Sequence, residues 1–178
     1  MKRTSKRIFP LALATTIAAI LSTVLFAPTA NAAGNTWIQT LRLTHDGTNH
    51  LCLDSTGRLQ PNPGTWIVEA RQCTSGTGNQ LWHRRGTEIR KANTGQCLDS
   101  NRAGDVYIME CNGGTYQKWR LVGRNGGIQV KNLETKRYLA IGFEFPSRPG
   151  SGSWFVRTYP EPQELGNLRT STFDFAGG

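Results

Sequence analysis

The side chains best suited to chemistry in this sequence are carboxylates in similar surroundings. Asp54 and Asp99 each follow Cys-Leu and precede Ser, and Glu69 and Glu110 lie in the alternating runs that come after them. Two carboxylates on either side of a glycosidic bond would supply the acid and the base that glycoside hydrolysis requires. The two aspartates also precede Ser-Thr-Gly and Ser-Asn-Arg, where such a residue commonly caps a turn. A functional site and turn formation are therefore the alternatives.

Other catalytic and metal-binding patterns do not occur in the sequence. His45, His50 and His83 do not form a metal-ligand spacing such as H-E-x-x-H, and the chain has no G-x-S-x-G, P-loop or C-x-x-C motif. His50 and His83 are predicted to be strand positions. We predict no cofactor, no metal and no enzymatic activity, because the fold inferred below offers shallow sites instead of a deep cleft.

The carboxylates belong to an internal repeat. Cys-Leu-Asp-Ser occurs at residues 52–55 and again at 97–100, and Gln80-Leu81-Trp82 is followed later by Gln117-Lys118-Trp119. The order is the same each time: C-L-D-S, an alternating run that ends in a cysteine, and Q-x-W. Repeats of this length indicate that one supersecondary unit occurs several times.

A third copy is degenerate. Residues 130–140 align without gaps on residues 89–99, which places Tyr138 where Cys97 stood and Ala140 where Asp99 stood. The run WFVRTY (154–159) is then predicted to match VYIMEC (106–111). No third Q-x-W follows, and Gly166-Asn167-Leu168 is the nearest remnant.

Each copy contains about four short alternating runs separated by turn residues, and helical periodicity is absent. One copy cannot bury its apolar face alone, and three copies of four strands close into a β-trefoil with few free edges. We predict an all-β fold, a β-trefoil with pseudo-threefold repeats at about 36–85, 86–124 and 125–178. Trp82 and Trp119 are predicted to be equivalent core residues, and the glutamines two positions before them to bond to the backbone.

The first 32 residues are typical of a secretory signal peptide. Residues 1–7 are basic, residues 8–26 are apolar, and Ala30 and Ala32 precede the predicted cleavage site. The alternative is a retained membrane anchor, because the apolar run is nearly long enough to span a bilayer. Export predicts a secreted, extracellular protein with a mature domain at 33–178 that has no membrane span.

Export also predicts that the four cysteines form disulfides. The simplest pairing is Cys52 with Cys73 and Cys97 with Cys111, each within its own copy. Pairing between copies is the alternative, and it would break the symmetry of the repeat.

The formal net charge of +9 does not indicate a nucleic-acid partner. Lys2, Arg3, Lys6 and Arg7 contribute four of the positive charges, and no later block of like charge is longer than a pair such as Arg84-Arg85. The distribution is typical of a solvated basic surface.

The C-L-D, Cys and N-Q-x-W pattern resembles the ricin B-type lectins and the related trefoil carbohydrate-binding modules of bacterial glycosidases. The resemblance covers the mature chain, strongly in two copies and weakly in the third, and implies a saccharide partner of galactose or xylose type. In that family the aspartate of C-L-D accepts hydrogen bonds from sugar hydroxyls, which assigns Asp54 and Asp99 to the site. The family also uses an amide before Q-x-W. Asn79 supplies it in the first copy, and Tyr116 stands there in the second.

The sequence departs from the family pattern at the stacking ring. The position two residues before the second cysteine holds Arg71 in the first copy and Met109 in the second. Because residues two apart share a strand face, Tyr107 is predicted to act as a displaced platform beside Met109, and Glu69 to pair with Arg71. We expect one or two weak sites, in copies one and two, and a lost site in copy three.

Aromatic residues are concentrated after residue 137, and Phe143 and Phe145 lie in a Gly/Pro-rich stretch that predicts a long loop. Such a loop is either tucked over the barrel or offered to a secreted protein partner. Degenerate ricin-like trefoils serve as cell-binding subunits of bacterial toxins such as the cytolethal distending toxins. The alternative function is therefore a non-catalytic accessory or cell-binding subunit of a secreted toxin or enzyme complex. A trefoil inhibitor of hydrolases ranks last, because no reactive loop is recognisable.

Overall fold

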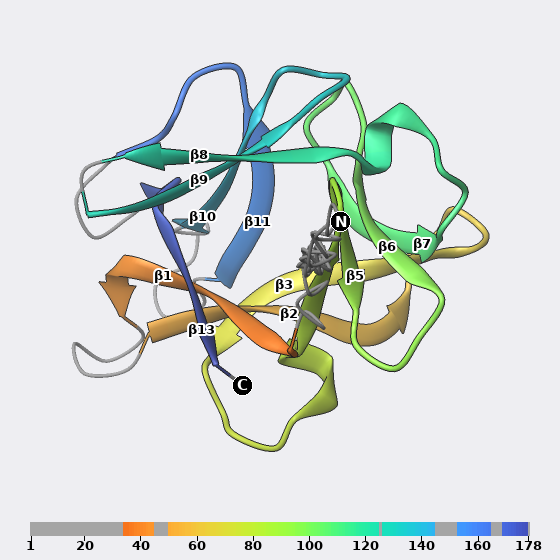
Figure 1. The fold of residues 1–178 in the computed structure, drawn as a ribbon, viewed down its shortest axis with the longest axis horizontal. Coiled ribbons are helices and arrows are strands. Elements are labelled where there is room, and N and C mark those ends of the chain that lie inside the picture. The colour runs from red at the N-terminus through yellow and green to blue at the C-terminus, as the bar shows by residue number, and fades with distance from the viewer. Residues whose placement is uncertain (1–33, 45–49, 125, 145–152, 165–168, 178) are drawn as a thin grey trace, which may run out of the picture. The chain divides into compact units, whose positions relative to one another are not determined.

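Strands dominate the computed structural model of the protein (Figure 1). The structure describes residues 34–44, 50–124, 126–144, 153–164 and 169–177. These residues all belong to one compact unit, residues 31–178. The predicted signal peptide at 1–32 lies outside the described residues. An all-β fold, as predicted, is what the described residues show.

The strands are β1 (Thr36–Thr44), β2 (His50–Leu59), β3 (Thr65–Gln72), β4 (Trp82–Arg85), β5 (Glu88–Lys91), β6 (Gln96–Ser100), β7 (Val106–Glu110), β8 (Trp119–Arg124), β9 (Gly127–Asn132), β10 (Tyr138–Glu144), β11 (Ser153–Tyr159), β12 (Arg169–Thr170) and β13 (Phe173–Gly177). Two 3-10 helices, η1 (Gly78–Gln80) and η2 (Thr115–Gln117), precede β4 and β8. We refer to residues 36–85, 86–124 and 125–178 as the first, second and third segments.

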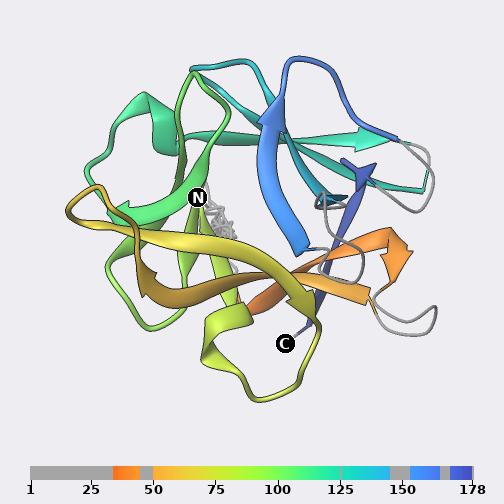
Figure 2. The ribbon, with the colours of Figure 1, turned by 180° about the vertical axis from the view of Figure 1, so that it is seen from behind.

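Six strands close a barrel. β1 pairs with β13 and β4, β4 pairs with β5, and β9 pairs with both β8 and β13. The backbone N–H of Trp119 donates to Thr87 O over 2.7 Å, which links the start of β8 to the start of β5. Figures 1 and 2 show the first strand, in orange, beside the last strand, in dark blue.

Three antiparallel hairpins complete the architecture: β2–β3, β6–β7 and β10–β11. They are linked to one another, because β3 pairs with β7 and Asp105 forms a bridge with Arg157 between the start of β7 and β11. The outer residues of β7 alternate with buried ones, as a half-buried strand requires. The hairpins carry the side chains of the candidate site.

The hydrophobic core contains residues from all three segments. Trp82 and Trp119 are its largest members, and both are almost completely buried. Each indole donates a hydrogen bond from Nε1 over 2.9 Å to the carbonyl of a C-L-D leucine, Leu53 for Trp82 and Leu98 for Trp119. The prediction that these tryptophans are equivalent core residues is confirmed.

The glutamines of Q-x-W bond to the backbone, as predicted. Gln80 donates to Gln72 O and accepts from Thr74 N, and Gln117 donates to Glu110 O and accepts from Asn112 N, all over 2.9–3.0 Å. The glutamine side chain thus ties the end of the third strand of its segment to the following 3-10 helix.

Both disulfides join cysteines of one segment. Cys52 bonds to Cys73 and Cys97 to Cys111, with Cα–Cα distances of 4.9 and 5.0 Å. No free cysteine occurs in the described residues. The simplest predicted pairing is the observed one.

The third copy ends without a Q-x-W motif, as the sequence indicates. Gly166-Asn167-Leu168 lies outside the described residues. The place of Q-x-W is taken by residues 171–173. Ser171 Oγ accepts a hydrogen bond from Gln163 N over 3.0 Å, as the glutamine Oε1 atoms do in the other segments, and Phe173 is fully buried. No Q-x-W can be recognised in the sequence because a serine accepts the backbone hydrogen bond in place of the glutamine, and a phenylalanine fills the core in place of the tryptophan.

The strand register also corrects the alignment of WFVRTY. Tyr138 lies opposite Tyr159, whereas Cys97 lies opposite Met109. Tyr159 therefore corresponds to Met109, two residues away from the predicted match with Cys111. The apolar alternation of the two strands has a period of two, so a shift by two residues leaves the pattern unchanged.

The predicted long loop is shorter than expected at both ends. β10 continues to Glu144 and β11 begins at Ser153, and Phe143 lies opposite Trp154 within this hairpin. The rings of Phe143 and Trp154 meet edge to face, with centroids 4.9 Å apart. Phe145 lies outside the described residues. Aromatic pairing thus extends the hairpin into a stretch whose Gly and Pro content predicted a loop.

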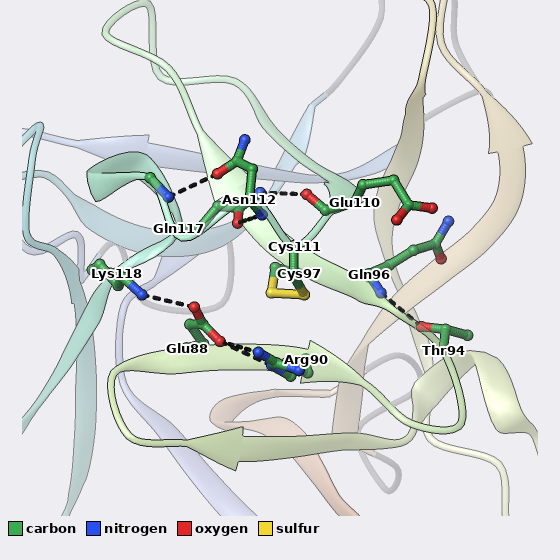
Figure 3. A network of polar contacts seen from close by, with 11 residues as sticks. Glu88, Arg90, Thr94, Gln96, Cys97, Glu110, Cys111, Asn112, Gln117 and Lys118 are labelled. Carbon is green, nitrogen blue, oxygen red and sulfur yellow. Dashed lines mark hydrogen bonds and ion pairs between the residues drawn. A yellow bond between two sulfur atoms is a disulfide. The ribbon is translucent and has the colours of Figure 1, made fainter.

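A buried acid joins β5 to the residue that precedes β8 (Figure 3). Glu88 is 7% exposed and accepts hydrogen bonds from Lys118 Nζ over 2.7 Å and from Arg90 Nη2 over 2.6 Å. These bonds lower the pKa of Glu88 from its ordinary value of 4.5, with Lys118 as the larger cause. The ionised form of Glu88 is therefore the one that stabilises the fold.

We expect Glu88→Gln to lower the free energy of unfolding at pH 7 by about 1–3 kcal/mol, because the hydrogen bonds from Lys118 and Arg90 lose their charge-assisted acceptor. A depressed pKa contributes stability above the unfolded value of 4.5, and that contribution disappears as the pH falls through the folded value. The difference between wild type and variant should shrink below pH 4.5 in urea titrations. Glu134→Gln is the control, because Glu134 is partly exposed and pairs over 3.6 Å with the exposed side chain of Arg102. An equal effect of both variants would contradict the prediction.

Candidate carbohydrate-binding site

A pocket of about 380 Å³ lies on the second segment, beside the β6–β7 hairpin. Its lining combines one carboxylate, two phenol rings, two amides, a guanidinium and a thioether. The residues are Asp99, Asn101, Arg102, Tyr107, Met109, Asn112, Gly114 and Tyr116. A shallow pocket with this mixture of rings and hydrogen-bonding groups suits a small polyhydroxylated ligand.

Strand pairing brings the two predicted residues of this segment together. Asp99 on β6 lies opposite Tyr107 on β7, and Met109 lies two residues further along the same face. All three line the pocket. The prediction that Tyr107 shares a face with Met109 agrees with this geometry.

Asp99 is the buried acceptor of the pocket. Its side chain is 3% exposed, and its Oδ1 atom is buried and has no hydrogen-bond partner in the described part of the chain. Burial raises the pKa of Asp99 above its ordinary value of 3.8, and hydrogen bonding by Gln117, Tyr107 and the Ser100 backbone offsets this only in part. A ligand hydroxyl that donates to Oδ1 would supply the missing bond and stabilise the ionised carboxylate.

Tyr107 is held as a neutral donor beside this acid. Burial, and then the charge and hydrogen bonding of Asp99, raise the pKa of Tyr107 to about 12. The phenol is therefore protonated throughout the physiological range. Its half-buried ring presents an apolar surface to the pocket, on which the C–H face of a sugar can lie.

Loops and the η2 helix supply the rest of the lining. Tyr116 belongs to η2, and Asn112 precedes it, with its Oδ1 accepting from Gly114 N over 2.8 Å. Asn101, in the loop between β6 and β7, donates to Asp105 Oδ2 over 2.9 Å. These bonds hold two of the lining amides in place within the protein itself.

One glycine is required at the rim. Gly104 has φ +100°, and a Cβ there would lie 2.8 Å from Thr158 O on β11. The two backbones are this close because Thr158 N donates a hydrogen bond to Gly104 O over 2.8 Å. The loop that carries Asn101 and Arg102 is therefore anchored to the third segment.

The first segment arranges its predicted residues differently. Asp54 is 5% exposed and accepts a hydrogen bond from Gln80 Nε2 over 3.1 Å. The residue opposite Asp54 is Glu69, which pairs with Arg71 over 3.0 Å and also with Arg58. The predicted pairing of Glu69 with Arg71 is observed. Ion pairs thus occupy the position at which the second segment presents Tyr107.

Asn79 completes the predicted set in the first segment. It lies in η1, exposed, directly before Gln80, and its backbone carbonyl accepts from Ser55 Oγ over 3.0 Å. In the second segment Tyr116 stands at this position. The same backbone place therefore offers an amide in one segment and a ring in the other.

The third segment has no acid at this place. Ala140 stands opposite Arg157 where Asp99 stands opposite Tyr107, and Ala140 is fully buried. The prediction that the third copy lacks the aspartate acceptor agrees with this register.

Sequence reasoning did not assign Asn101, Arg102, Asn112, Gly114 and Tyr116 to the site. Tyr116 had a usable signal, since an aromatic residue replaces the family's amide directly before Q-x-W. The other four lie in turns, where no periodicity indicates which way a side chain points.

No group of three or more His, Cys, Asp or Glu side chains able to hold a metal ion occurs among the described residues. In the same part of the chain, no helix has the length and apolar character needed to cross a membrane.

The closed barrel, the three hairpins and the pocket beside C-L-D define a β-trefoil of lectin type. A family model described as the ricin-type β-trefoil lectin domain matches residues 21–134. The chain belongs to this family, as the repeat pattern indicated. The match ends before most of the third segment, where the sequence pattern is degenerate.

Solved structures share the fold at low sequence identity. A structure of the cytolethal distending toxin from Actinobacillus actinomycetemcomitans is 14% identical, with a TM-score of 0.59, over 80% of this chain and 91% of that chain. The Haemophilus ducreyi cytolethal distending toxin is 12% identical, with a TM-score of 0.58, over 80% and 83%. ThreeFoil, a designed threefold-symmetric protein, is 19% identical, with a TM-score of 0.54, over 79% and 97%.

Proposed function

We propose that the protein is a secreted, non-catalytic carbohydrate-binding protein whose principal saccharide site is the pocket around Asp99. The observation that carries the proposal is the buried Asp99 Oδ1, which lacks a donor among the described residues at a pocket lined by two tyrosines. Sugar hydroxyls would donate to the carboxylate, and the ring face would lie on Tyr107 or Tyr116. Membership of the ricin-type lectin family supports a ligand of galactose or xylose type.

At most one of the three segments combines the acid and the ring at one site. We propose that they are pseudo-threefold repeats of one four-strand unit, of which the second retains acid and ring. The first keeps Asp54 but closes it with Gln80 and a charged cluster, and the third has Ala140. Binding at one shallow pocket would be weak, since millimolar affinity corresponds to about 4 kcal/mol.

Secretion is part of the proposal. The basic and apolar residues of 1–32 and the pairing of all four cysteines in disulfides support an oxidising, extracellular location.

A glycan array followed by calorimetry with the best saccharide tests the function. We expect Asp99→Asn to weaken binding about 10- to 100-fold, because a charge-assisted hydrogen bond contributes about 1.5–3 kcal/mol. Asp54→Asn is the matched control and should leave the affinity within about twofold, since Asp54 is bonded to Gln80. The proposal would be contradicted if the protein bound no saccharide on the array, or if wild type and Asp99→Asn bound the best saccharide with equal affinity.

A second candidate function is a cell-binding or accessory subunit of a secreted complex. It is favoured by the fold shared with two cytolethal distending toxin structures. The hairpin β10–β11, with the Phe143–Trp154 pair, is then the proposed protein interface. Co-purification from the culture supernatant of the source organism tests it, and a monomer without any partner would count against it.

A further inference from the structure

A second pocket, of about 710 Å³, lies between β8 at the end of the second segment and the third segment, and it shares no lining residue with the Asp99 pocket. It is lined by residues of β8, β9, the start of β10 and the turn after β11. They are Val122, Gly123, Arg124, Gln129, Tyr138, Glu161, Pro162, Gln163 and Glu164.

The strand register shows what fills this place in the second segment. Lys131 lies opposite Tyr138 as Arg90 lies opposite Cys97, so Tyr138 takes the place of Cys97. Tyr138 lies opposite Tyr159 as Cys97 lies opposite Met109. Glu161 and Cys111 each follow by two residues, so Glu161 takes the place of Cys111. A disulfide thus occupies in one segment the position that two polar residues line in the other (Figure 3).

The same register places Gln129 where Glu88 stands, two residues before Lys131 and Arg90 respectively. Glu88 is satisfied by Lys118, the residue before Trp119. The residue before Phe173 is Thr172, whose hydroxyl donates to Glu164 instead. Among the described residues, the third segment therefore has no side chain equivalent to Lys118 to fill the space above Gln129.

Gln129 is consequently an unsatisfied group at the pocket. Its side chain is 4% exposed, and its Nε2 atom is buried without a hydrogen-bond partner in the described residues. A buried amide donor without an acceptor lowers the stability of the fold, and a ligand oxygen that accepts from it would remove that cost.

The charges around the pocket favour an uncharged ligand. Arg124 contributes a cation and Glu161 and Glu164 contribute anions, while Lys131 lies 4.6 Å from the ring centre of Tyr138. Positive and negative side chains around the pocket are therefore nearly equal in number, and they supply both hydrogen-bond donors and acceptors. A molecule that carries several hydroxyls can donate to the carboxylates and accept from the amide and the guanidinium.

We propose that this pocket is a second binding site, for a neutral sugar or polyol, with Gln129 Nε2 as its buried donor. The site lies at the place of the missing disulfide, and none of the counterparts of Asp99, Tyr107 and Met109 line it. It is therefore independent of the function proposed for the Asp99 pocket.

Side-chain amide NMR of the whole protein tests the proposal, with D-galactose, D-xylose and the open-chain xylitol as probes. The Gln129 amide pair is identified by its loss in Gln129→Met. Each probe is titrated to about 100 mM, because a few hydrogen bonds give millimolar affinity. We expect the pair to shift and saturate, in wild type and in Asp99→Asn alike, and the xylitol arm separates a polyol site from a sugar-ring site.

Backbone amides of Gly123 and Glu161 follow binding in the variants. Gln129→Met should weaken it about tenfold, which corresponds to about 1.4 kcal/mol. The exposed variant Glu161→Gln should also weaken it and leaves the core untouched, and Gln96→Met, on β6 outside both pockets, is the matched control. A Gln129 amide that shows exchange with water and no shift with any probe means a water-filled cavity and overturns the proposal. A shift that disappears in Asp99→Asn also overturns it.

Discussion

Trp119→Ala is expected to lower the free energy of unfolding by about 3–5 kcal/mol. Trp119 is 1% exposed and its indole donates to Leu98 O over 2.9 Å, so the substitution leaves both a large cavity and an unsatisfied buried carbonyl. Trp82→Ala should cost about the same, because Trp82 is fully buried and bonds to Leu53 O in the same way. Guanidinium titration followed by circular dichroism measures both.

Two further variants make this result specific. Leu59→Ala removes an apolar side chain that is 63% exposed and should change stability by no more than about 0.5 kcal/mol. Trp119→Phe retains most of the ring and should lose about 1–3 kcal/mol for the bond to Leu98. A loss below about 1 kcal/mol in Trp119→Ala would mean that this ring is not part of a close-packed core.

Removal of the second disulfide is expected to cost about 3 kcal/mol. The Cys97–Cys111 bond closes a loop with a sequence separation of 14, and the Cys52–Cys73 bond one of 21, so removal of the latter should cost slightly more. The double variant Cys97→Ala with Cys111→Ala leaves no reactive thiol behind. Thermal unfolding with and without reductant compares the two bonds.

The variant that lacks all four cysteines should lose about 6 kcal/mol, which approaches the whole stability of an ordinary domain. Wild type in reductant should melt at the temperature of that variant. A fully reduced protein that melts within a few degrees of the oxidised one would show that barrel packing alone holds the fold.

Much of the fold could be predicted because two segments repeat their key motifs. C-L-D-S, the second cysteine and Q-x-W recur in one order, and each motif has a distinct structural role. The cysteines of C-L-D-S and of the following run form the disulfide, the glutamine of Q-x-W bonds to the backbone, and its tryptophan fills the core. The end of the third segment could not be aligned in this way. There Ser171 and Phe173 replace glutamine and tryptophan, and a shift of two residues along β11 preserves the alternation.

The candidate site was predictable only where strands build it. Alternation placed Tyr107 beside Met109, and register brings Asp99 opposite Tyr107. The wall formed by Asn112 depends on turn geometry after the disulfide, for which the sequence offers no period, whereas Tyr116 could be found from its place directly before Q-x-W. The alignment placed Tyr138 at the position of Cys97, but the counterpart of Cys111 was hidden, because it depends on which residue lies opposite Tyr138 in the folded chain.

The pairing of β1 with β13 places Thr36 opposite Gly177. Because this seam joins the two extremes of the trefoil, the barrel stays open until its last strand is available, and the folding transition must involve sequence-distant contacts. A circular permutant joined at this seam and opened in another turn should retain the architecture while folding from a different end.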